Sequence, residues 1–267
     1  DHYRINKQIG MHLFTRDGAR LISVQMNQSS SPELRDLRVR QAIIYAINNK
    51  GIASKIMRGF ATPAGQQSPP GYLGHQPQLV PRFDLELAST LMDQAGYSKG
   101  FRLSMIAPNN RYVNDAKIAQ AIVIMLAKIN IEVELMTMPK AQYWQKYDQG
   151  GADLMMVGWH SDTEDSANFS EFLAMCRDLD SGYGRYNGGH YCNPEVDRIV
   201  SASAQQTDTQ KRAQMLQQVE HILYQDAAFV PLHWQHLAWG SHRGIDIGNV
   251  LTVGNIPYLA DLVINQP

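Results

Sequence analysis

The stretch from Gly158 to Phe169, GWHSDTEDSANF, concentrates side chains that could bind a charged solute. An apolar run ends there in Trp159 and His160, and Asp162 follows directly. A carboxylate in an enclosed cleft can bind a cationic ammonium group. An alternative, favoured by spacing alone, is a solvated acidic loop, because the ligand spacing of an EF-hand calcium loop is missing. The acids concerned are Asp162, Glu164 and Asp165.

A second stretch, Ala107 to Asp115 or APNNRYVND, lies between a predicted strand and a predicted helix. Arg111 could present its planar guanidinium to a carboxylate, and Asn110 and Tyr112 flank it. An arginine beside a helix start could equally form a surface ion pair. With Trp159, His160 and Asp162, these three residues make up the predicted ligand-binding set.

Several aromatic side chains could line the wall of a ligand cleft, because aromatic residues suit pockets that accept varied groups. The simpler alternative is that they fill the core or cover the surface. They are Tyr72, Tyr112, Tyr143, Trp144 and Trp159.

Nine histidines invite a metal-site interpretation, above all His233 and His236, and His190 beside Cys192. The motifs that would support it are missing: there is no HExxH, and the cysteines lack the close paired spacing of structural zinc sites. GxSxG, P-loop and dinucleotide-binding GxGxxG motifs are also missing. We therefore expect no metal, no cofactor and no enzymatic activity.

The only two cysteines, Cys176 and Cys192, lie in one stretch rich in Gly, Asp, Asn and Tyr. This arrangement suits a disulfide in an oxidising compartment. Two free thiols in a cytosolic protein are the alternative.

The composition indicates a globular chain, with 44% hydrophobic and 18% charged residues among 267. With 24 basic and 25 acidic side chains, the formal net charge of −1 provides no long-range field to attract nucleic acid. No apolar run approaches the roughly 18 residues that span a bilayer. Because the sequence starts at Asp1 without a leader, we expect a processed or trimmed piece of a longer protein.

The first half of the sequence predicts a strand over 21–27 and then an amphipathic helix, with Val39, Ile43, Ala46 and Ile47 on its apolar face and Arg38, Arg40 and Asn48 on its wet face. The proline-rich stretch 61–81 is expected to be an ordered or wrapping loop. A short helix should span 84–95.

Strands and helices alternate in the middle of the chain. The strands FRLSMIAP, IEVELMTM and ADLMMVGW are separated by helices over 115–129 and 140–149. This β-α-β-α-β order predicts an α/β fold with a mainly parallel sheet flanked by helices. Ligand-binding residues collect at the carboxyl ends of such strands.

The C-terminal part begins with a long polar segment over 161–193. Helices are predicted over 194–204 and 209–224, and strands over 229–234 and 245–253.

Five segments in this order resemble the dipeptide- and oligopeptide-binding proteins of bacterial ABC importers, the family 5 extracellular solute-binding proteins. They are PELRDLRVRQAIIYAINNKGI, ATPAGQQSPPGYLG, FDLELASTLMDQAGYSKGFRL, ADLMMVGWHSDTEDSANF and YCNPEVDRIV. The resemblance implies a periplasmic-binding-protein-like lobe of a two-lobed, Venus-flytrap protein. Residues 29–238 would form the second lobe, 1–28 would be a remnant or crossover segment of the first lobe, and 239–267 would return to it.

The resemblance also implies a function: an exported, periplasmic or extracytoplasmic monomer that passes peptides to an ABC permease. Asp162 would receive a peptide's amino terminus, and the arginine that meets the carboxyl terminus would fall near Arg111. The sequence departs from the family pattern at Ser166, where proline is common, and at His160. The alternatives are nickel, haem or sugar binding by the same fold, or a ligand-sensing domain of a cytosolic transcriptional regulator.

Overall fold

In the computed structural model, the described residues are 10–250, 252 and 254–264, and they are organised around one six-stranded sheet. The strand order is β2 (Ala61–Pro63), β6 (Phe229–His242), β1 (Met11–Met26), β5 (Leu154–Trp159), β3 (Phe101–Pro108) and β4 (Ile131–Met138). β3 pairs in parallel with both β4 and β5. β1, β6 and β2 complete the sheet through antiparallel pairs, so the parallel strands form one half of a mixed sheet.

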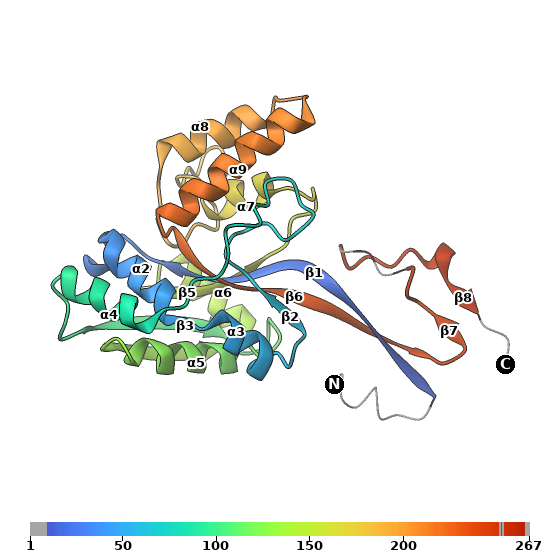
Figure 1. The fold of residues 1–267 in the computed structure, drawn as a ribbon, viewed down its shortest axis with the longest axis horizontal. Helices are drawn as coiled ribbons and strands as arrows, with labels where there is room; N and C mark the ends of the chain where they lie inside the picture. Colours follow the sequence, from blue (N-terminus) through green and yellow to red (C-terminus); the bar gives the residue numbers. More distant parts are fainter. Residues whose placement is uncertain (1–9, 251, 253, 265–267) are drawn as a thin grey trace.

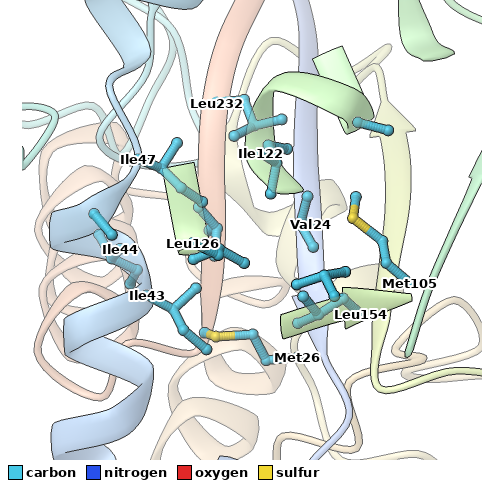
Figure 2. Packing of buried hydrophobic residues seen from close by; sticks show 14 of the residues in the cluster. Val24, Met26, Ile43, Ile44, Ile47, Met105, Ile122, Leu126, Leu154 and Leu232 are labelled. Atoms are coloured by element: carbon cyan, nitrogen blue, oxygen red, sulfur yellow. The ribbon is translucent and has the colours of Figure 1, made fainter. Parts of the chain in front are cut away.

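One face of the sheet is covered by α2 (Leu37–Ala46), α4 (Leu85–Gln94) and α5 (Asp115–Ala127), with the short α3 (Asn49–Gly51) and the π-helical Ile52–Ile56 beside them (Figure 1). The apolar side chains of α2 and α5 meet the sheet in the main core. Figure 2 shows Ile43 of α2, Ile47 directly after it and Leu126 of α5 near Val24 and Met26 of β1. The predicted inward positions of α2 are thereby confirmed.

The other face of the sheet carries α6 (Lys140–Asp148) and α7 (Ser166–Leu173), whose Tyr143 and Phe169 are fully buried. Next to them, α8 (Pro194–Ser203) and α9 (Thr209–Gln225) pack through a separate apolar cluster. Helices on both faces of a sheet with a parallel section make this the expected α/β fold.

The ends of β1 and β6 continue past the rest of the sheet as a two-stranded ribbon (Figure 1). Met11 pairs with His242 and Arg16 with Leu237 along this ribbon. β7 (Ile245–Asp246) and β8 (Val263–Ile264) form a small second sheet close to it.

Most predicted elements are confirmed, with two exceptions in the C-terminal half. The predicted strand over 245–253 is wrong in its described part, because β7 ends at Asp246 and a turn covers 248–250. Residues 251 and 253 lie outside the described residues. The polar segment 161–193, for which no helix was predicted, contains the helix α7.

The prediction that Arg40 lies on the wet face of α2 is also wrong. Arg40 is 6% exposed, and its guanidinium donates hydrogen bonds to the carbonyl oxygens of Leu34, Arg35, Asp226 and Ala227. The five donors of a guanidinium can satisfy several carbonyls at once, which makes its burial tolerable. Arg40 thus joins the start of α2 to the segment that follows α9.

The proline-rich loop 61–81 is ordered by buried polar contacts, as expected. The side chain of Gln66 donates to the carbonyl of Gln76 and accepts the N–H of the same residue. The carboxyl group of Glu220 in α9 accepts the N–H groups of Gln67 and Ser68 at 3.1 and 2.9 Å. These bonds replace the backbone pairing that an irregular buried segment lacks.

Cys176 and Cys192 form the predicted disulfide, which links the segment after α7 to the segment before α8. Replacing both cysteines with serine should lower the free energy of unfolding by about 3 kcal/mol, because closing a 16-residue separation restricts the unfolded chain. Denaturant titration of the oxidised protein and the variant measures the difference. Adding reductant should destabilise the parent protein and leave the serine variant unchanged; equal stability of the two proteins would contradict the prediction.

Glu220 should make the stability of the fold depend on pH. Complete burial raises the pKa of its carboxyl group from 4.5 to about 7. The pKa of Glu220 is higher in the folded than in the unfolded protein, so protonated Glu220 favours the folded state. This contribution to the free energy of unfolding is complete below about pH 4.5 and is lost as the pH rises through about 7. Its magnitude is on the order of 3 kcal/mol. Denaturant titrations across this range should show a smaller decline for Glu220→Gln than for the parent.

The exposed Glu134 provides the control for this experiment. Glu134→Gln should retain the parent's pH dependence, because it removes a carboxyl group from the surface and leaves Glu220 in place. A Glu220→Gln profile that parallels the parent's would exclude Glu220 as the source.

Candidate ligand-binding site

A cavity of about 510 Å³ opens at the carboxyl ends of β3 and β5. Four of the six predicted ligand-binding residues line it: Arg111, Trp159, His160 and Asp162. The first comes from the loop after β3, and the others come from the end of β5 and the residues that follow. The carboxyl edge of the parallel strands therefore gathers these side chains, as the strand order predicted.

The remaining two predicted residues, Asn110 and Tyr112, are not part of the cavity lining. The side-chain oxygen of Asn110 accepts the N–H of Lys140 at 2.8 Å, so it ties the loop after β3 to the start of α6. Tyr112 is only 7% exposed, and its hydroxyl accepts the N–H of Gly158 at 2.9 Å. Both side chains therefore hold the loop after β3 in place without lining the cavity.

The position of Arg111 depends on a close contact between its neighbour Tyr112 and Gly158. A Cβ atom at position 158 would lie 2.6 Å from Cε1 of Tyr112 and 2.7 Å from Cδ1 of Ile22, so only glycine fits there. The Asp115 carboxylate accepts the N–H groups of Arg111 and Tyr112 at 2.9 and 3.0 Å. The loop that carries Arg111 is thus fixed against β5 and against the first turn of α5.

Arg20 also lines the cavity, although no sequence motif marked it as a ligand-binding residue. A bulge in β1 places it there: Arg16 pairs with Leu237 and Arg20 with Gln235, so residues 17–19 oppose a single residue of β6. Gly18 allows this bulge, because a Cβ atom there would lie 2.1 Å from the carbonyl oxygen of Gln235. Arg20 could have been predicted as a lining residue only from the bulged pairing of β1 with β6, and no sequence pattern indicated that pairing.

The other lining residues that the predicted ligand-binding set omitted come from three elements. Lys140, Trp144 and Asp148 belong to α6, Gly158 to β5, and Arg185 and Tyr186 to the loop after α7.

Aromatic rings form one wall of the cavity. The ring centroid of Trp159 lies 4.9 Å from that of Phe172 and 5.2 Å from that of Tyr186, and Trp144 lies 6.1 Å from Tyr186. The indole N–H of Trp159 donates to the side-chain oxygen of Asn168 at 2.8 Å, which fixes the ring. Of the five aromatic residues proposed for a cleft, Trp144 and Trp159 line the cavity, whereas Tyr72, Tyr112 and Tyr143 are buried outside the lining.

The acidic loop is divided between an exposed carboxylate and a buried one. The side chain of Asp162 is 90% exposed at the cavity, with Oδ1 3.6 Å from Nε2 of His160. Burial lowers the pKa of His160, and the charge of Asp162 partly opposes this shift. A carboxylate that keeps most of its surface in water remains available to an incoming cation.

Asp165, in contrast, does not belong to a solvated loop. It is 6% exposed, its Oδ1 accepts the N–H of Ala167 at 3.0 Å as the N-cap of α7, and its Oδ2 lies 2.6 Å from the guanidinium of Arg212. The N–H of Ser166 donates to the carbonyl oxygen of Leu73 at 2.9 Å, a bond that proline at this position could not make. Asp165 and Ser166 therefore attach the acidic loop to α9 and the proline-rich loop.

The histidines form no metal-binding group in the described part of the chain, where no three His, Cys, Asp or Glu side chains are placed to hold an ion. His233 is completely buried, and burial lowers its pKa to about 4. A larger cavity, of about 760 Å³, lies beside α5 and β6, and none of the predicted ligand-binding residues lines it.

Comparison with known proteins identifies the family. The sequence profile of the bacterial extracellular solute-binding proteins, family 5 Middle, matches residues 2–180. The chain belongs to this family. Among curated family relatives, the dipeptide-binding protein of Escherichia coli is 25% identical over 85% of this chain and 42% of its own length. Heme-binding protein A of Haemophilus influenzae is 26% identical over 83% of this chain and 40% of its own length.

Solved structures share the fold of this chain. The Helicobacter pylori periplasmic binding protein DppA, in complex with the peptide STSA, aligns with a TM-score of 0.86 and 22% identity over 99% of this chain and 51% of its own. NikA of Staphylococcus aureus, in complex with Ni(L-His)2, aligns with a TM-score of 0.81 and 19% identity over 99% and 55%. The predicted periplasmic-binding-protein-like fold is confirmed, and this chain spans about half the length of these proteins. No helix in the described ranges is long and apolar enough to cross a membrane.

The two aspartates of the acidic loop should differ sharply in their effect on stability. Asp165→Asn should lower the free energy of unfolding by about 2 to 4 kcal/mol, because it leaves the partly buried guanidinium of Arg212 without its counterion. Asp162→Asn should change it by less than about 0.5 kcal/mol, because that side chain is exposed. Denaturant titration of both variants measures the difference, and similar losses would contradict this division of the loop.

Proposed function

We propose that this chain is the second-lobe part of an ABC-importer binding protein that captures short peptides and delivers them to a membrane permease. Residues 29–238 would form this lobe, with 1–28 and 239–267 connecting it to the first. β1 pairs with β5 only from Leu21 onward, and its earlier residues pair with β6 alone. The ribbon that β1 and β6 form beyond the sheet supports a connection to the first lobe at this edge (Figure 1). The whole protein would be exported, as the disulfide supports, and it would act as a monomer.

The observation that carries this proposal is the presence of an exposed carboxylate and a guanidinium in one aromatic-walled cavity. Asp162 would bind the amino terminus of the peptide and Arg111 its carboxyl terminus. Trp159, supported by Phe172 and Tyr186, would contact the side chains and backbone of the solute. Charged groups of both signs match a zwitterion, whereas rings alone would accept many solutes.

The family comparisons leave the solute class open, since the relatives include a heme-binding protein and a structure with Ni(L-His)2. The paired charges in the cavity favour a peptide over these alternatives. The role is one of binding, in line with the solute-binding relatives. The disulfide disfavours a cytosolic regulator, because such bonds are rare in a reducing compartment.

Asp162→Asn should weaken the binding of dipeptides to the full-length protein by about 2 to 5 kcal/mol, because the closed complex would leave the solute's ammonium group without a counterion. Titration calorimetry with the parent and the variant measures the loss. Glu164→Gln is the matched control, since it removes the same charge from an exposed residue of the same loop that does not line the cavity.

Arg111→Ala should weaken dipeptides with a free carboxylate more than their amidated forms in the same assay. If the Asp162→Asn protein binds a peptide with the parent's affinity, Asp162 does not bind the amino terminus, and a haem, nickel or sugar solute would be favoured instead.

A further inference from the structure

The cavity proposed as the peptide site carries more positive than negative charge. Four cationic side chains line it, and the only carboxylates among its lining residues are Asp148 and Asp162. A zwitterionic dipeptide brings one charge of each sign, so it would neutralise none of this excess. The cations are Arg20, Arg111, Lys140 and Arg185.

Two of these cations, Arg20 from β1 and Arg111 from the loop after β3, line the same cavity. Arg20 follows the β1 bulge, and Arg111 is held by the bonds of its loop to Asp115 and β5. Burial lowers the pKa of Arg20, and the charge of Arg111 lowers it further. Two guanidinium groups near each other in a partly desolvated wall repel, and an anion between them relieves that repulsion.

Neither arginine is neutralised by a carboxylate of the described ranges. Arg20 and Arg111 form no ion pair with a carboxylate of the residues that the structure describes. The Nε of Arg111 is buried and has no hydrogen-bond partner among the described residues. The guanidinium of Arg111 lies 5.3 Å from the ring centre of Tyr112. A buried donor without an acceptor is costly, so this guanidinium is not satisfied within the described residues. The part of it that lines the cavity can donate charge-assisted hydrogen bonds to an anionic ligand.

We propose that Arg20 and Arg111 form an anion subsite and that the solute carries a net negative charge, as in a short peptide with an acidic side chain. The proposal rests on the peptide-binding function proposed above and names the class of peptide. Arg111 meets one carboxylate and Arg20 the second, while Asp162 binds the ammonium group. Arg20 is then the residue that determines specificity for acidic over neutral peptides.

Matched dipeptides test this inference in the full-length protein. Calorimetry should show that Ala-Glu binds the parent roughly 10- to 100-fold more tightly than its neutral isostere Ala-Gln, because a charged group gains a charge-assisted hydrogen bond. Arg20→Gln should abolish most of this preference and leave the affinity for Ala-Gln within about threefold of the parent's. Arg20→Lys, which retains the charge without the planar fork, should retain part of the preference.

Arg16→Gln is the matched control, because it removes the same charge from an exposed position on the same strand that does not line the cavity. It should leave the preference unchanged, and circular dichroism should show the same unfolding midpoint for each folded variant. If Arg20→Gln does not fold, the comparison of the parent with Arg20→Lys decides. Equal or tighter binding of Ala-Gln by the parent would overturn the inference and leave the peptide-binding function standing.

Glutarate, a dicarboxylate without a peptide bond, separates the two proposals. If the parent binds no dipeptide but binds glutarate in a manner that Arg20→Gln weakens, the anion subsite stands and the peptide function falls. If it binds neither Ala-Glu nor glutarate, the inference is overturned.

Discussion

The site depends on the contact between Tyr112 and Gly158. The N–H of Gly158 donates to the Tyr112 hydroxyl at 2.9 Å, and the missing side chain at position 158 leaves space for the aromatic ring. Burial of this ring raises the pKa of its hydroxyl, so the group stays neutral and available as a hydrogen-bond partner. The loop after β3 is thereby held against the end of β5, which places Arg111 in the same cavity as Trp159. A larger residue at position 158 would separate the two strand ends that form the site.

The sequence predicted the parts of the fold that depend on local periodicity and strand order. The alternation of strands and helices between Phe101 and Trp159 located the parallel strands, and the carboxyl edge of these strands then located Arg111 and Asp162. The isolated cysteines also predicted their pairing. These predictions need only the order of elements and the directions of their ends.

The features that the sequence did not reveal depend on pairing between distant segments. Arg40 has the spacing of a wet-face residue, and the distant carbonyls of Asp226 and Ala227 supply two of the four acceptors that make its burial tolerable. Asp165 resembles its neighbours in an acidic loop until Arg212 of α9 provides its partner. Arg20 reaches the cavity through a bulge that three residues of β1 make against β6. In each case, a partner that decides the placement lies more than 40 positions away in the chain.

The exposure of the charged residues bears on how tightly the described lobe could bind a solute by itself. Asp162 keeps 90% of its side-chain surface in water, where an ion pair is worth at most about 1 kcal/mol. The same pair becomes stronger when water is excluded, because the effective dielectric constant falls. A second surface that closes over the cavity would therefore strengthen the contacts of Asp162, Arg111 and Arg20 without changing their geometry. In such an arrangement, the charged groups of this cavity would determine which solute binds, and closure would determine how long it stays bound.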